Sequence, residues 1–109
     1  MAAVDKAQPA PIAVTGVVGV DGAMVVSIAG ELDMSNVDVV RRQVDHLIVA
    51  APTSIVFDLA ELTFMDSSGI AFLVQVAAQV KEISLRHVPG LIQRVLEATG
   101  VTELLAVER

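Results

Sequence analysis

The sequence lacks cysteine and has little histidine, two residue types on which much protein chemistry depends. None of the 109 residues is cysteine, which excludes disulfides, catalytic thiols and cysteine-bound zinc. His46 and His87 are the two imidazoles in the sequence, so histidine-based catalysis and zinc sites have few groups to draw on. A metal site built from carboxylates alone stays open, but we expect no cofactor and no catalytic centre.

Aromatic and basic residues are also scarce. Aromatic side chains make up 3% of the sequence, with no tryptophan or tyrosine, and 7 lysines and arginines face 13 aspartates and glutamates, which gives a net charge of −6. Proteins that bind nucleic acids usually carry a basic surface and aromatic rings that stack on bases. The composition therefore argues against DNA or RNA as a partner.

No apolar run is long enough to cross a bilayer, although 54% of the residues are hydrophobic. The most apolar segment, residues 69–80, contains two glutamines and is shorter than the roughly 20 residues that a bilayer needs. Residues 1–11 have no apolar core of the kind that a secretory signal needs. We expect a disordered tail over residues 1–11, one domain over residues 12–109, no membrane insertion and a place in the cytoplasm.

The patterns that are present begin with two strand-like segments. Residues 12–20 and 23–29 are rich in valine and isoleucine, and Asp21 and Gly22 between them suit a tight turn, which predicts a β-hairpin. Residues 54–59 form a nearly continuous apolar strand, a pattern typical of a central strand covered on both faces. These segments indicate a β-sheet.

Two amphipathic segments predict helices against that sheet. The first begins at Ser35, where Asp38 completes a capping box, and ends before Pro52. The second runs from Ser68 to about Glu82. The apolar residues expected to face the sheet in this second helix are Ile70, Leu73, Val74, Ala77 and Val80.

Phe72 and Val76 lie well off that predicted face, at about 100° of rotation per helical residue. Phe72 is then either an exposed anchor for a partner protein or a side chain packed against a neighbouring helix. The sequence leaves both possibilities open.

The last third of the sequence predicts three further elements. Residues 83–88 form a strand, residues 91–99 a helix, and residues 101–107 a short strand or a helical turn. The whole pattern predicts an α/β fold: a single domain with a mixed β-sheet that opens with a β-hairpin, later strands that are parallel, and helices packed on the sheet.

The motif that stands before the second helix is Asp66, Ser67, Ser68 and Gly69. One aspartate or serine would be enough to cap a helix, so three in succession, followed by a glycine that allows a close backbone approach, indicate a second role. Free amides and the helix dipole stabilise a phosphate at such a place. A phosphoserine there, with a charge of about −1.5 to −2, would repel an acidic or apolar partner.

Two stretches in the same order resemble a known family. Residues 56–70, VFDLAELTFMDSSGI, closely resemble the central signature of STAS-domain anti-sigma factor antagonists, and residues 30–33, GELD, resemble an upstream loop of that family. The resemblance covers roughly residue 12 to the C-terminus. It implies a partner that is both anti-sigma factor and ATP-dependent serine kinase, which ends the binding by phosphorylating Ser67, and a phosphatase that restores it. ATP is then the kinase's ligand.

Six residues are predicted to form the partner-binding site: Asp33, Asp66, Ser67, Ser68, Gly69 and Phe72. Asp33 and Asp66 could instead be plain helix caps, and Ser68 is favoured as a structural cap. The resemblance places the loop that holds Asp33 beside the serine that would be phosphorylated.

One departure from the family pattern and two other possible functions bear on this prediction. The link over residues 81–91 is shorter than the family pattern implies, which puts the fourth strand and third helix in question. STAS domains also serve as regulatory subunits of membrane transport systems, which bind a protein without a phospho-switch. A hydrolase with Ser67 as nucleophile is disfavoured because the Gly-x-Ser-x-Gly elbow is absent.

Overall fold

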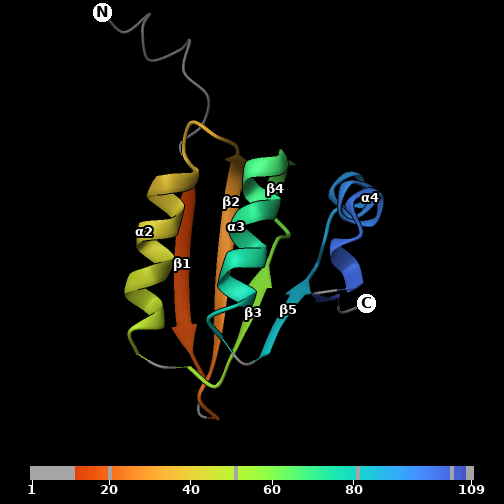
Figure 1. Ribbon diagram of the computed structural model, residues 1–109. Coiled ribbons are helices and arrows are strands. Elements are labelled where there is room, and N and C mark those ends of the chain that lie inside the picture. Colours follow the sequence, from red (N-terminus) through yellow and green to blue (C-terminus); the bar gives the residue numbers. More distant parts are fainter. Residues whose placement is uncertain (1–11, 20, 51, 81, 104, 108–109) are drawn as a thin grey trace, which may run out of the picture.

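A computed structural model of the chain shows a mixed β-sheet with helices packed on it (Figure 1). It describes residues 12–19, 21–50, 52–80, 82–103 and 105–107, so the tail predicted for residues 1–11 lies outside the described residues. The elements, in chain order, are β1 (Ala13–Val18), β2 (Ala23–Leu32), α2 (Val37–Ile48), β3 (Ser54–Asp58), β4 (Leu62–Met65), α3 (Ser67–Ala77), β5 (Glu82–Arg86), α4 (Gly90–Thr99), the 3-10 helix η1 (Val101–Glu103) and β6 (Ala106–Val107).

The opening β-hairpin is confirmed. β1 and β2 pair antiparallel, with Val18 opposite Met24. The amide of Gly19 donates to the carbonyl of Ala23 at 2.7 Å, and Gly22 adopts a φ of 84°, which glycine tolerates at no steric cost. This turn sets the register of the first two strands.

The predicted central strand is β3, which lies between β2 and β5 and is parallel to both. Ile55 and Phe57 are fully buried under the helices, and Figure 1 shows α2 and α3 side by side over this face of the sheet. The alternate residues of β3 are only half-buried. The second face is therefore only partly covered, contrary to the prediction from the continuous apolar run.

The sequence pattern does not predict β4, although this strand positions the motif. β2 has 10 residues and pairs with two strands in succession: with β3 over its first half and with β4 over its last three residues. The register shifts between Gly30 and Glu31, where Gly30 has a φ of 112°. This irregularity lets β4 continue the pairing of β2 beyond the end of β3.

The ends of the first two helices differ from the predictions. α2 begins at Val37 after Asn36, with no side-chain capping bond, so the capping box predicted from Ser35 and Asp38 is wrong. The Ser35 hydroxyl donates instead to the side chain of Asp33. α3 ends at Ala77, short of the predicted residue 82, because Glu82 already pairs with β3.

The prediction that Phe72 points away from the sheet is wrong. Phe72 is 1% exposed, and its ring packs edge-on against Phe57 with ring centroids 6.0 Å apart. Val76, predicted to lie off the sheet-facing side as well, is 2% exposed. The buried residues of α3 are Gly69, Ile70, Phe72, Leu73 and Val76, so Ile70 and Leu73 are buried as predicted and the buried side is wider than the predicted face.

The elements after α3 form despite the short link. β5 and α4 match the predicted strand and helix, and α4 ends at Gly100 with a left-handed φ of 76°. Both alternatives for residues 101–107 occur, as η1 followed by β6. The sheet order β1-β2-β3-β5-β6, with β4 beside β2, completes the predicted α/β fold.

Candidate functional site

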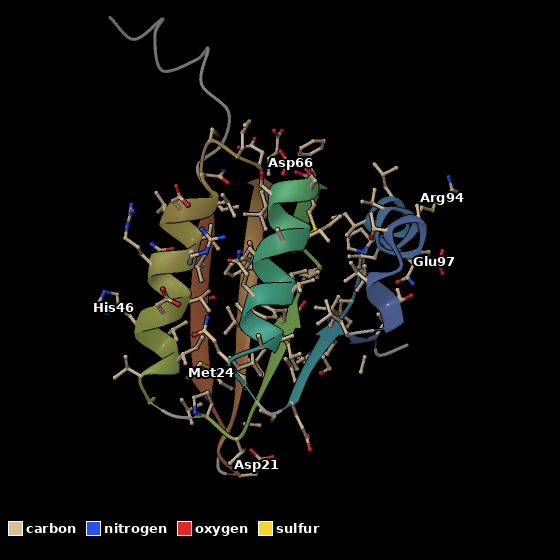
Figure 2. The ribbon with its side chains drawn as sticks, in the orientation of Figure 1. Asp21, Met24, His46, Asp66, Arg94 and Glu97 are labelled. Atoms are coloured by element: carbon tan, nitrogen blue, oxygen red, sulfur yellow. The ribbon has the colours of Figure 1, made fainter. Side chains whose placement is uncertain are left out.

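The predicted motif lies where β2 and β4 end and α3 begins. β2 and β4 are parallel neighbours, so their carboxyl ends reach the same end of the sheet (Figure 1). The loop of residues 33–36, which connects β2 to α2, lies at this end, and Figure 2 shows Asp66 at the start of α3. The topology therefore brings the two stretches that carry the family resemblance together.

Asp66 connects these segments. It is the N-cap of α3: its Oδ1 accepts from the amide of Ser68 at 2.9 Å and, more weakly, from that of Gly69 at 3.4 Å. Its Oδ2 accepts from the amide of Met34 at 3.2 Å, and its own amide donates to the carbonyl of Leu32 at 3.2 Å. A single carboxylate thus caps the helix and holds the 33–36 loop beside it.

Ser67 is the first residue of α3, and it is exposed. Its hydroxyl therefore stands at the positive end of the helix dipole, in a place that an enzyme can reach. Ser68 is half-buried, and the prediction that Ser68 caps the helix is wrong because Asp66, two residues earlier, supplies the capping oxygen.

Gly69 is a packing position in the first turn of α3. A Cβ placed on this residue would lie 2.7 Å from the Cγ of Met65 and 3.0 Å from the Cδ2 of Leu32. The nearest atoms are side chains of β2 and β4, so the predicted close approach of another backbone is not what requires glycine at this position. Because Gly69 is buried, it can influence the partner-binding surface only by fixing the positions of the residues around it.

Asp33 organises the 33–36 loop. Its Oδ1 accepts from the amide and the hydroxyl of Ser35 at 2.9 and 2.5 Å, and its amide donates to the side chain of Asn36 at 3.0 Å. The hydroxyl and amide of Ser35 lower the pKa of Asp33 below its ordinary value of 3.8, so the carboxylate is charged at neutral pH. The carbonyl of Asp33 also accepts from the amides of Asn36 and Val37 where α2 begins, so its contacts match the alternative of a structural role at the helix start, and a contact with a partner stays a prediction.

Sequence reasoning missed two apolar residues at this site. Met34 is 76% exposed in the loop that Asp66 holds, and Phe64 is 44% exposed in β4, two residues before Asp66. Met34 follows Asp33 directly, and Phe64 is separated from Asp66 by Met65. Alternation along a strand would have placed Phe64 on the buried side with Leu62, so sequence reasoning could not have found it. The register shift between β2 and β4 is what exposes it.

Three acidic residues lie at or beside the motif. Asp33 and Asp66 lie at the site, and Glu31 pairs with Phe64 across β2 and β4. Among the described residues, no group of three or more His, Cys, Asp or Glu side chains is arranged to hold a metal ion. Over the same residues, no helix has the length and apolarity needed to span a membrane.

Comparisons with known proteins match both the sequence and the fold. The family model described as "Mlab, STAS domain" matches residues 12–106. An anti-sigma F factor antagonist of Paenibacillus polymyxa is 30% identical over 91 residues, which are 79% of this chain and 78% of the relative. The crystal structure of an anti-sigma factor antagonist from Mycobacterium paratuberculosis has a TM-score of 0.82 at 22% identity and covers 92% of this chain and 89% of that one.

The phosphorylated form of the Bacillus cell fate determinant SpoIIAA has a similar structure. Its TM-score is 0.66 at 20% identity, over 89% of this chain and 92% of that one. At these identities the two solved structures show a shared fold, whereas the family model and the P. polymyxa relative show the family. This chain belongs to the STAS-domain family of anti-sigma factor antagonists.

Proposed function

We propose that this protein binds an anti-sigma factor that is also a serine kinase, and that this binding releases a sigma factor. Phosphorylation of Ser67 ends the binding, and a phosphatase restores it. The observation that carries the proposal is the exposed Ser67 at the first position of α3, beside the Asp66 cap, in a chain of the antagonist family. A relative with the same fold has been solved in a phosphorylated form.

The surroundings of Ser67 explain why a phosphate would end the binding. A phosphoserine adds a charge of about −1.5 to −2 next to the carboxylate of Asp66. The amides of Ser68 and Gly69, which could otherwise hold a phosphate, already donate to Asp66. Much of the added charge therefore remains directed at the partner, where it opposes acidic groups and costs desolvation at an apolar contact.

The proposal assigns no chemistry to the chain itself. ATP binds to the kinase, and the antagonist supplies the hydroxyl of Ser67 as the substrate group. The protein then works as a binding module in the cytoplasm, together with its kinase and phosphatase.

The test uses the full chain and purified serine-kinase anti-sigma factors from the source organism. With ATP and the cognate factor, we expect the mass of the chain to rise by one phosphate, which peptide mapping places on Ser67. Ser67→Ala abolishes the mass change, whereas Ser68→Ala, the matched control one residue along, keeps it. A chain that binds none of these factors and gains no phosphate would favour a regulatory subunit of a transport system.

A further inference from the structure

We propose that Met34 and Phe64 are the apolar anchors through which this protein binds its partner, and that the partner presents an apolar depression bordered by lysine or arginine. The inference rests on the proposed function, because it concerns the surface around Ser67. It goes further by naming the side chains that supply the affinity and the chemistry of the surface that receives them.

Met34 extends from a well-organised loop. Its amide donates to Asp66 at 3.2 Å, and the residues on either side are held by the bonds between Asp33 and Ser35 and by Asn36, whose side-chain amide donates to the carbonyl of Glu31 at 2.7 Å. The side chain is nevertheless 76% exposed. A thioether on a fixed backbone adapts to an apolar surface with little loss of backbone entropy, so it suits a binding contact.

Phe64 is the exception among the phenylalanines. Phe57 and Phe72 are 0% and 1% exposed, whereas Phe64 is 44% exposed. After the register shift, Phe64 pairs with the exposed Glu31 of β2, whereas Met65 pairs with the buried Leu32, so Phe64 stands on the outer side. Phenylalanine and methionine are both enriched in the buried cores of protein interfaces relative to the rest of the surface.

The positions of these two residues matter more than their exposure, because single exposed apolar residues are ordinary on protein surfaces. Both adjoin Asp66: Met34 through its amide bond to Oδ2, and Phe64 through its place two residues earlier in the chain. A phosphate on Ser67 would therefore lie close to both anchors, and the carboxylates of Asp33 and Asp66 stand among them. This combination fits an apolar surface with a basic border.

The test separates apolar anchoring from charge attraction. The probe is the purified anti-sigma factor that phosphorylates the chain in the assay above, and its affinity for each full-length variant is measured by titration calorimetry at low and high salt. We expect Met34→Ser and Phe64→Ser each to weaken binding about tenfold at both salt concentrations. Asp33→Asn should weaken binding mainly at low salt, because salt screens exposed charges.

Val49→Ser is the matched control, since Val49 is 82% exposed at the C-terminal end of α2, the opposite end of that helix from the 33–36 loop. It should change the affinity less than twofold, which is the scale of an ordinary surface substitution. Circular dichroism melting of each variant separates lost affinity from lost folding. If the parent binds and both anchor variants bind as tightly as Val49→Ser, the assignment of the anchors is wrong and the proposed function stands. If the parent binds no anti-sigma factor, the proposed function fails, and the inference fails with it.

Discussion

The single carboxylate of Asp66 makes two structural contacts, one within α3 and one to the 33–36 loop. Oδ1 caps α3 through the amide of Ser68, and Oδ2 holds the amide of Met34, 32 residues away in the sequence. The position of the exposed Ser67 relative to the 33–36 loop therefore depends on this side chain. A serine or asparagine at the same place could cap the helix, but each has one side-chain oxygen and could not accept with two separate oxygens as Asp66 does.

Replacement of Asp66 should show the two contributions separately. We expect Asp66→Ala to lower the free energy of unfolding by about 2 kcal/mol, since it removes the cap and the loop contact. Asp66→Asn keeps an oxygen for the cap but loses the second acceptor, and it should cost about 1 kcal/mol. Urea unfolding followed by circular dichroism measures both. Asp45→Ala, on the exposed side of α2, is the control, and equal losses in all three variants would contradict the dual role.

Gly69 tests the packing under the site. Alanine normally improves a helix by about 1 kcal/mol over glycine, but here its Cβ would meet Met65 at 2.7 Å and Leu32 at 3.0 Å. We expect Gly69→Ala to destabilise the protein by about 1–3 kcal/mol in urea unfolding. Gly90→Ala provides the comparison, because nothing lies within 4 Å of a Cβ there and this variant should not lose stability. A gain in stability in both variants would show that the site has room for a methyl group.

At the scale of elements, β3 and β5 are joined at their carboxyl ends by a polar contact. Asp58 accepts from Arg86 Nη2 at 3.4 Å and from the amide of Ala60 at 3.1 Å, and it lies 3.2 Å from His87 Nδ1. Burial raises the pKa of Asp58, but the Ala60 amide, His87 and Arg86 outweigh that effect, so the pKa falls below its ordinary value of 3.8. The ionised carboxylate is the form that the fold prefers.

The contact of Asp58 with Arg86 and His87 predicts that part of the free energy of unfolding depends on pH. Because the pKa of Asp58 is lower in the folded state, its contribution is present above pH 3.8 and is lost as the pH falls through the lowered value. We expect Asp58→Asn to cost about 1 kcal/mol near pH 7 and progressively less in acid. Urea unfolding of parent and variant from pH 7 to below 3.8 measures the difference. A second comparison in a His87→Gln background removes the imidazole that lies 3.2 Å from Asp58, so that the pH dependence of the carboxylate is measured without it. A difference that does not change with pH would rule out this role for the carboxylate.

The elements also show what the sequence could predict. The hairpin, β3, β5 and α4 follow from apolar patterns and turn residues that act locally. β4 could not be predicted from its four residues alone, because it exists through pairing with the last residues of β2. The burial of Phe72 was missed for a similar reason: it depends on the packing of its ring against Phe57 of β3, a contact between distant segments that widens the buried side of α3 beyond Ile70 and Leu73.

At the scale of the whole molecule, the fold brings two distant stretches into one acidic, partly apolar surface. The family resemblance marked Asp33, Asp66 and Ser67, and the structure places Ser67 on the surface, next to Asp66, which holds the loop that contains Asp33. Met34 and Phe64 could not be identified from sequence, since their exposure depends on how the loop and β4 pack. The net charge of −6 gives the molecule an overall field that favours a basic partner.

The central claim is that charge on the side chain at position 67 controls binding. It is tested most directly by titration calorimetry of the cognate anti-sigma factor against four forms of the full chain: the parent, the chain phosphorylated on Ser67, Ser67→Ala and Ser67→Glu. We predict that the parent and Ser67→Ala bind equally well, while the phosphorylated chain and Ser67→Glu lose at least tenfold in affinity, about 1.4 kcal/mol. Equal affinity of the phosphorylated chain and the parent would contradict the account.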